Sequence, residues 1–374
     1  MKLETLAVHA ASRPDETTGA VAPPIHLSTT FARRPDGTPI GGHTYVRESN
    51  PTQDRLEEAL AAVEGGEGCL VFASGMAAGV ALLQTLPPGS LVLLPDDAYY
   101  GYRVAAEEFL PAWGIRTRLV AMDDLASLES ALGERPALVW LETPSNPLLK
   151  VTDLAAALAL ARSAGAQTLV DGTFATPFLQ RPLELGADAV LHATTKAIGG
   201  HSDVQGGALV FRRKDALFQR VAHLRHVLGA VASPFNSWLV LRGLRSLGCR
   251  MAAASASAAT VARFLASHPA VSAVHYPGLP DHPGYEVARR QMRAFGSMLS
   301  FRLREGREAA LAVVARAALF VRATSLGGVE SLIEHRATSE GPASRTPPEL
   351  VRLSIGLEHP DDLVEDLRQA LGGP

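Results

Sequence analysis

Short apolar runs alternate with longer segments of helical periodicity through most of this chain, and no other feature constrains the fold as much. Strands that alternate with helical stretches indicate a mostly parallel sheet with helices on both faces. We therefore predict an α/β fold. The segments expected to be strands of the main sheet cover residues 69–72, 90–94, 116–120, 137–141, 167–170, 187–191 and 206–211, and all but 116–120 are mainly apolar.

A chain of 374 residues is longer than a domain with a single hydrophobic core usually is, so we expect two domains. Residues 1–50 contain five prolines and several glycines without sustained periodicity. They predict an extended N-terminal arm, which has no core of its own and should therefore pack on another part of the protein. We place a large domain at 51–250 and a small α/β domain at 251–374, with the boundary at the start of an alanine-rich stretch.

The composition excludes several classes of protein. Hydrophobic residues make up 47% of the chain, which is typical of a globular protein. The net charge is −3, so the chain lacks the excess of positive charge that nucleic-acid-binding proteins carry. The two cysteines, Cys69 and Cys249, make a disulfide framework improbable. No apolar run is long enough to span a membrane and no signal-peptide core begins the chain, so we expect a cytoplasmic protein. His223 and His226 lack an acidic or cysteine cluster, and we predict no metal site.

Lys196 is the first candidate for chemistry. It follows the apolar run 187–191 and stands among small residues, so its ammonium group is expected to be partly withdrawn from water. Desolvation disfavours the charged form of a lysine, and the free amine is the form that condenses with an aldehyde cofactor. The alternative is a solvated lysine after a strand.

Two polar residues at neighbouring strand ends support this interpretation. Asp171 ends the apolar run that begins near residue 167, at the edge where open α/β sheets bind ligands. A carboxylate there can keep the ring nitrogen of pyridoxal 5'-phosphate (PLP) protonated, although a turn aspartate is the alternative. Asn146 lies between Pro144 and Pro147, which restrict the turn so that its amide could hydrogen-bond the phenolate oxygen of the cofactor.

A third strand end offers a place for the phosphate group. The run 69–72 leads into a small-residue turn with Ser74, Gly75 and Met76, and a helix follows to residue 86. The first backbone N–H groups of a helix are unpaired and bind anions, although an ordinary strand-to-helix turn has the same pattern. The dinucleotide fingerprint Gly-x-Gly-x-x-Gly is absent from this turn, which argues against a dinucleotide fold.

Taken in order along the chain, these motifs resemble the Cys/Met-metabolism family of PLP-dependent enzymes. The family includes cystathionine γ-synthase, cystathionine γ- and β-lyases and methionine γ-lyase. The resemblance implies PLP fold type I, with a seven-stranded sheet, and a homotetramer built from dimers that share active sites. The motifs that carry it are Tyr45-Val46-Arg47-Glu48-Ser49-Asn50-Pro51-Thr52, Ala73-Ser74-Gly75-Met76, Glu142-Thr143-Pro144-Ser145-Asn146-Pro147, Val170-Asp171, Thr194-Thr195-Lys196, Ser325-Leu326-Gly327-Gly328 and Val351-Arg352-Leu353-Ser354-Ile355-Gly356.

The resemblance assigns roles around the cofactor. It implies that Lys196 holds PLP covalently and removes the α-proton of an amino-acid substrate. Thr194 and Thr195 would contact the phosphate. Tyr45 and Arg47 would reach the phosphate in the neighbouring subunit, because a guanidinium beside a second donor suits a dianion.

It also assigns roles around the substrate. Tyr99 would stack on the cofactor ring and pass a proton to the leaving group, with Tyr100 as the alternative. Arg352 would bind the substrate α-carboxylate through a two-pronged hydrogen bond. Ser325 and Asn146 would assist at that carboxylate.

The chain departs from the family at several positions. Ala193 stands where a serine is common, so a hydroxyl contact to phosphate is lost and the threonines that follow must compensate. Thr44 and Thr324 stand where many cystathionine-using members have an acid. The segment 334–350 is shorter than usual and carries Arg336 where proline is common, which changes the substrate entrance.

The activity that we predict first is γ-elimination on cystathionine, which is the reaction of a cystathionine γ-lyase. Cystathionine γ-synthase, which performs γ-replacement on an O-activated homoserine, is second and methionine γ-lyase is third. An aminotransferase on the same fold would share Lys196 and Asp171 but would not explain the motifs at Tyr45 and Ser325. A non-catalytic PLP-binding protein is the alternative outside these classes.

Overall fold

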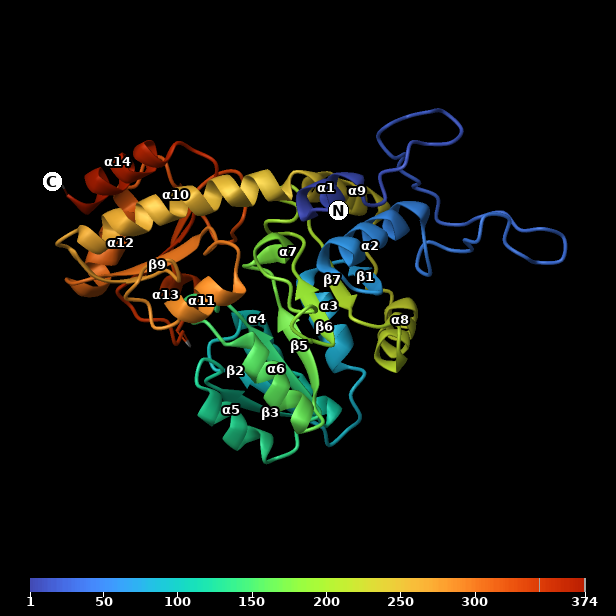
Figure 1. Cartoon of the computed structure of the whole chain (residues 1–374), viewed down its shortest axis with the longest axis horizontal. Coiled ribbons are helices and arrows are strands. Elements are labelled where there is room, and N and C mark those ends of the chain that lie inside the picture. The colour runs from blue at the N-terminus through green and yellow to red at the C-terminus, as the bar shows by residue number, and fades with distance from the viewer. Residues whose placement is uncertain (343, 373–374) are drawn as a thin grey trace.

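The computed structural model describes residues 1–342 and 344–372, and its larger part is built on a seven-stranded sheet (Figure 1). Six of the strands run parallel, and β7 alone runs antiparallel to both of its neighbours. This confirms the predicted fold class. The strand order is β1 (Gly68–Phe72), β7 (Gly207–Phe211), β6 (Ala189–His192), β5 (Gln167–Asp171), β4 (Leu138–Glu142), β2 (Leu91–Pro95) and β3 (Arg116–Val120).

Side chains of the buried strands alternate between two cores, one on each face of this sheet. In β4, for example, Leu138 and Trp140 belong to one core, and Val139 and Leu141 belong to the other. A parallel sheet covered on both faces needs apolar residues at every strand position, which is why these strands are continuous apolar runs. The helices of the first core are α3 (Gly75–Leu83), α4 (Tyr100–Glu108) and α8 (Ala216–Leu228); those of the second include α2 (Pro51–Glu64), α5 (Leu125–Leu132), α6 (Leu154–Ser163), α7 (Thr176–Leu179) and α9 (Pro234–Arg245).

A five-stranded sheet forms the C-terminal part, and its two faces differ in polarity. Val351 and Leu353 pack into an apolar core, so Arg352 between them lies on the opposite face. The register places Glu334 beside Arg352 on that polar face. The strand order is β10 (Val321–Arg322), β11 (Leu332–His335), β12 (Leu350–Ser354), β9 (Met298–Leu303) and β8 (Val271–His275), and the helices are α11 (Tyr285–Gln291), α12 (Gly306–Arg316), α13 (Arg336–Glu340) and α14 (Pro360–Leu371).

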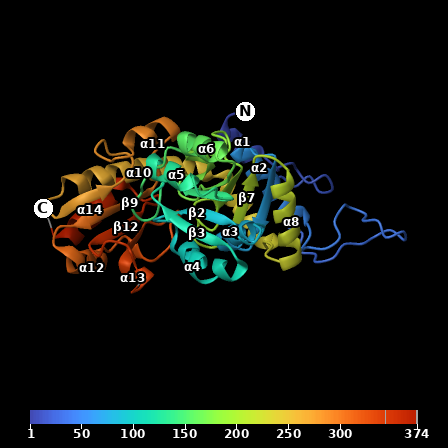
Figure 2. The same cartoon turned by 90° about the horizontal axis from the view of Figure 1, so that it is seen from below.

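One helix, α10 (Leu247–Ser267), runs between the two parts, as Figures 1 and 2 show. Leu247 and Met251 near its start belong to a core of the large sheet, whereas Val261 and Leu265 near its end belong to the core of the small one. The domain boundary proposed between residues 250 and 251 therefore falls inside a continuous helix.

The N-terminal segment differs from the expected arm at its start. Leu3–His9 form helix α1, which buries Leu3 and Ala7 against the large domain. After it, the chain makes two long loops that project from the body (Figure 1). Val21, Leu27 and Ile40 in these loops are largely exposed. No helix among the described residues is long and apolar enough to cross a membrane.

Candidate active site

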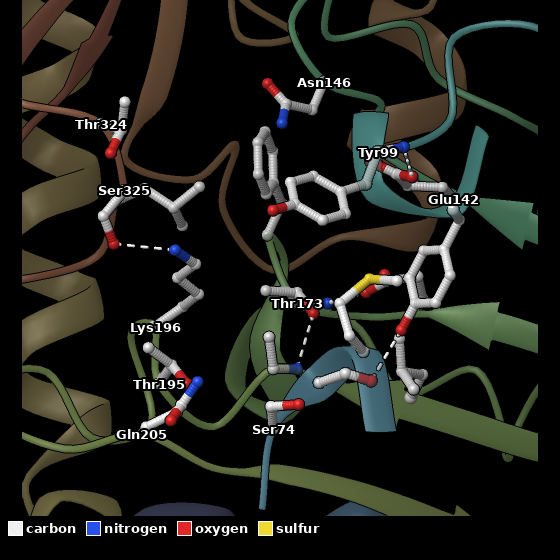
Figure 3. A pocket seen from close by; sticks show the side chains of 18 of the residues that line it. Ser74, Tyr99, Glu142, Asn146, Thr173, Thr195, Lys196, Gln205, Thr324 and Ser325 are labelled. Atoms are coloured by element: carbon white, nitrogen blue, oxygen red, sulfur yellow. Dashed lines mark hydrogen bonds between the residues drawn. The ribbon is translucent and has the colours of Figure 1, made fainter. Parts of the chain in front are cut away.

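A cavity of about 260 Å³ lies where the carboxyl ends of the large sheet meet the polar face of the small sheet. Figure 3 shows its side chains converging from several loops. Open α/β sheets bind ligands at this edge because the strands all end there in loops. The lining residues are Ser74, Gly75, Met76, Tyr99, Tyr102, Glu142, Asn146, Asp171, Thr173, Phe174, Leu191, Ala193, Thr195, Lys196, Gln205, Thr324, Ser325, Leu326, Arg336 and Arg352.

Lys196 extends into this cavity from the turn that follows β6. Its Nζ donates a hydrogen bond to Oγ of Ser325 at 2.8 Å, which joins the two domains across the site (Figure 3). Burial lowers the pKa of Lys196 to about 8, and the positive charges of Arg352 and Arg336 act in the same direction. A substantial fraction of this amine is therefore uncharged near neutral pH, as nucleophilic attack on an aldehyde requires.

Ser325 is held in an unusual backbone conformation. Its φ of 86° lies in the left-handed region, which few residues other than glycine adopt. Such conformations cluster at functional sites, where surrounding contacts maintain them. Here the conformation brings the Ser325 hydroxyl to Lys196 and its carbonyl oxygen to Arg352.

Asp171 and Glu142 form the acidic wall of the cavity. They are the last residues of β5 and β4 and are paired in register. Burial raises the pKa of Asp171, while a hydrogen bond from Thr173 opposes that rise. Burial and the neighbouring Asp171 raise the pKa of Glu142 well above its ordinary range, and Glu142 also accepts a hydrogen bond from the backbone N–H of Tyr99.

Among the described residues, Asp171 forms no salt bridge; the nearby His192 acts to lower its pKa but is hydrogen-bonded to Glu64. A buried carboxylate is stabilised by a nearby positive charge, and a protonated ring nitrogen supplies one. The position of Asp171 in the cavity wall therefore fits the heteroaromatic ring of PLP.

The turn before α3 forms the opposite end of the cavity. Ser74 caps this helix by accepting a hydrogen bond from the backbone N–H of Ala77. The turn is pressed closely onto the sheet: a Cβ atom built at Gly207 would lie 2.2 Å from the carbonyl oxygen of Ser74, and one built at Gly75 would lie 2.8 Å from Cβ of Ala193. Only glycine at these positions allows the free N–H groups of the helix to line the cavity, and they suit a phosphate.

The two threonines assigned to the phosphate are placed differently. Thr194 is buried and does not line the cavity. The hydroxyl of Thr195 donates to the carbonyl oxygen of Gly206 at 3.0 Å and accepts from its N–H at 2.9 Å. This hydroxyl thus closes a loop at the cavity wall, which Thr195 lines.

Arg352 lies at the substrate end of the cavity, where it is almost fully buried. It donates to Oδ1 of Asn146 and to the carbonyl oxygen of Ser325, each at 2.9 Å, and pairs with Glu334 at 2.8 Å. Burial lowers the pKa of Arg352 to about 10, which leaves the guanidinium charged at neutral pH. Because the amide oxygen of Asn146 accepts from Arg352, its NH₂ group remains to donate to a ligand.

Of the two candidate tyrosines, Tyr99 lines the cavity (Figure 3), whereas Tyr100 lines a separate apolar groove with Phe109 and Trp113. Tyr45 and Arg47, which were assigned to the phosphate of a neighbouring subunit, do not line the cavity of their own chain. They lie beside each other in the projecting arm, with Cζ of Arg47 5.2 Å from the ring centroid of Tyr45.

Several lining residues were not assigned from the sequence. Thr173 accepts a hydrogen bond from the N–H of Ala193 at 2.9 Å, and its hydroxyl in turn donates to the carboxylate of Asp171, which opposes the raised pKa of that acid. Tyr102 donates to the carbonyl oxygen of Gly75 at 2.7 Å and so supports the turn before α3. The position of Thr173 two residues after Asp171 was the only sequence signal for its role. Gln205, Phe174 and Glu142 also belong to this group.

Comparison with known proteins identifies the family. The model of the family described as "Cys/Met metabolism PLP-dependent enzyme" matches residues 4–372. The chain belongs to this family. It is thus a PLP-dependent enzyme of cysteine and methionine metabolism, as the motifs indicated.

Members of the Cys/Met-metabolism family with different activities are similar to it over almost their whole length. Cystathionine gamma-synthase of Mycobacterium tuberculosis is 50% identical over 98% of this chain and 96% of its own. Cystathionine beta-lyase of Lactococcus lactis is 42% identical over 99% and 98%. The crystal structure of cystathionine gamma synthase from Xanthomonas oryzae with cystathionine has a TM-score of 0.95 at 42% identity, covering 99% of this chain and 98% of that one.

Proposed function

We propose that this enzyme catalyses γ-replacement on an O-activated homoserine, with cysteine as the incoming thiol and cystathionine as the product. The observation that carries this proposal is the 50% identity with a mycobacterial cystathionine gamma-synthase over 98% of the chain. The β-lyase relatives are 40–43% identical. We therefore place γ-replacement ahead of γ-elimination, which the sequence motifs alone had put first.

Bound PLP supplies an electron sink that stabilises negative charge at the substrate α-carbon. The residues that we propose to hold it are Lys196 through a covalent bond, Asp171 at the ring nitrogen, and Ser74, Gly75 and Met76 at the phosphate. Their placement in one cavity supports these roles. Of the two threonines assigned to the phosphate from the sequence, we propose Thr195, because it lines the cavity and Thr194 does not.

The other lining residues orient the substrate and move protons. Arg352 and Asn146 bind the α-carboxylate and thereby fix the direction of the α-hydrogen. The substrate amine would displace Nζ of Lys196 from its covalent bond, and the freed amine, kept uncharged by its lowered pKa, would accept this hydrogen as a proton. Ser325 positions Nζ by accepting a hydrogen bond from it. The hydroxyl of Tyr99 donates a proton to the departing γ-substituent.

We propose that a second copy of the chain completes the site. Tyr45 and Arg47 lie on an exposed arm outside the cavity of their own chain, and a guanidinium suits the phosphate that the cavity is proposed to hold. The same arrangement repeated by symmetry gives a dimer with two shared sites, and two such dimers give the tetramer expected from the motifs.

γ-Elimination on cystathionine remains the second candidate. A cystathionine gamma lyase from Micromonospora echinospora is 43% identical, with a TM-score of 0.94 over both complete chains. Replacement and elimination need the same residues until the γ-substituent has left, so the residues proposed here serve either outcome.

The test separates the two reactions by their products. PLP-saturated enzyme is incubated with homoserine esters plus cysteine, with cystathionine alone, and with methionine alone. We expect cystathionine from the first mixture, and no formation in the Lys196→Ala variant. If 2-oxobutanoate from cystathionine forms faster than cystathionine from any ester, the enzyme is a γ-lyase; pyruvate would indicate a β-lyase, and 2-oxobutanoate mainly from methionine would indicate a methionine γ-lyase.

A further inference from the structure

Arg336 brings a second guanidinium into the cavity. It is the first residue of α13 and directly follows β11, in the segment that departs from the family pattern. Its side chain is only 9% exposed and lines the cavity together with Arg352. Both arginines contribute to the lowered pKa of Lys196, which is consistent with two positive charges near the amine.

The carboxylates around these two arginines do not neutralise all of the buried positive charge. Arg352 and Arg336 share one oxygen, Oε1 of Glu334, at 2.8 and 3.1 Å. Arg336 Nε donates to Glu340 at 3.1 Å, and Arg103 lies 3.6 Å from the same carboxylate. The side chains of this cluster are at most 11% exposed, so three guanidinium groups share two carboxylates in a poorly hydrated place.

Glu340 and Arg336 also differ in how many of their hydrogen-bonding atoms already have a partner. The second oxygen of Glu340 already accepts from the hydroxyls of Ser344 and Thr346, at 2.7 and 3.0 Å. By contrast, within residues 1–342 and 344–372 Nη2 of Arg336 makes no hydrogen bond. A buried guanidinium with an unused donor group beside the cavity is a binding site for an anion.

We propose that Arg336 binds an anionic group at the far end of the γ-substituent of the substrate. The proposal rests on the proposed function, in which Arg352 and Asn146 bind the α-carboxylate and a second anion must therefore come from elsewhere in the substrate. Homoserine esters that end in a carboxylate or a phosphate carry such an anion, whereas an acetyl ester does not. Arg336 thereby selects for anionic esters.

The experiment compares three probes, O-succinyl-, O-phospho- and O-acetyl-L-homoserine, each with cysteine as the second substrate. In the natural enzyme, we expect kcat/KM to be higher for at least one anionic ester than for the acetyl ester. In Arg336→Gln, kcat/KM for the preferred anionic ester should fall roughly 10- to 100-fold, the range for a charge-assisted hydrogen bond, and mainly through KM. The acetyl ester has no group for Arg336 to bind, so its kcat/KM should fall much less than that of the anionic ester, and the change that remains reflects the contribution of Arg336 to the lowered pKa of Lys196.

Two further variants separate binding from structural damage. Arg336→Lys keeps the charge without the planar fork, so it should retain part of the preference. Arg345→Gln removes a 59% exposed arginine of the same segment and should leave all three rates unchanged. The relative rates with the two anionic esters identify whether the site accepts a carboxylate or a phosphate.

The inference is overturned if the natural enzyme uses the acetyl ester as well as both anionic esters, a comparison that does not depend on any variant folding. It is also overturned if Arg336→Gln lowers the rates with all three esters equally, which would indicate a structural role. Formation of cystathionine from none of the esters would instead refute the proposed function.

Discussion

The lowered pKa of Lys196 can be measured directly in the cofactor-free protein. Burial, with Arg352 and Arg336 acting in the same direction, shifts this pKa from the ordinary value of 10.5 to about 8. At pH 7 roughly a tenth of the Lys196 side chains should be uncharged, against about 0.03% for an ordinary lysine, a ratio on the order of 300. The uncharged fraction grows as the pH rises and levels off above pH 8.

The chain is well suited to this measurement because Lys2, Lys150, Lys196 and Lys214 are its four lysines. Brief labelling with an amine-specific reagent at a series of pH values, followed by peptide mass spectrometry, gives a separate profile for each. Lys150 is the internal control. Burial opposes its charged form, but the carboxylates of Asp97, Asp96 and Asp123 outweigh that effect and raise its pKa.

We expect the labelling of Lys196 to be half-maximal near pH 8 and to reach its plateau between about pH 9 and 10, while that of Lys150 still rises. Arg352→Gln removes the larger of the two charge contributions, so the Lys196 profile should move to higher pH. If the Lys196 profile instead keeps rising beyond pH 10 in protein whose circular dichroism is unchanged, the proposal that burial activates this amine is refuted.

Three further predictions concern single residues. Asp171→Asn should lower kcat on the order of 100-fold or more while PLP remains bound, as steady-state kinetics and absorbance can check, because the carboxylate is proposed to keep the ring protonated. Gly207→Ala should weaken PLP affinity and lower the melting temperature because its Cβ would meet a carbonyl oxygen at 2.2 Å, whereas Gly41→Ala meets nothing within 4 Å and should change neither. Glu64→Leu, which leaves buried His192 without its 3.0 Å partner, should cost about 1–3 kcal/mol in urea unfolding, the range for an unsatisfied buried polar group; an unchanged midpoint would contradict that.

The fold was largely predictable because its signals are local. Each of the seven segments expected to be strands overlaps a strand of the large sheet. Six of them are mainly apolar, since a strand buried on both faces must be apolar along its length, whereas β3 at the sheet edge is partly exposed and carries two arginines. Helix α1 was missed because Leu3–His9 make only about two turns, too few for a periodic pattern to be distinguished. The N-terminal arm was otherwise recognisable from its prolines.

The candidate-site residues at or shortly after the end of a strand could be predicted from the sequence. Asp171 and Lys196 follow apolar runs, and the structure brings both to the cavity wall. Directions of side chains in loops were not predictable, because they depend on contacts between distant segments. Thr194 and Thr195 illustrate this: both adjoin Lys196 in the sequence, but only Thr195 lines the cavity.

The domain boundary shows how such a distant contact can matter to the site. Arg250 lies in the first turns of α10, and it donates to the carbonyl oxygens of Ala197 and Gly243 at 2.6 and 2.7 Å. A boundary drawn at this residue would suggest a flexible linker, yet the helix continues into the small domain's core and holds the turn after Lys196 at the same time. One rigid element thus fixes both Lys196 and the domain that carries Arg352. The distance between the proposed proton acceptor and the proposed carboxylate site therefore depends on the helix being continuous.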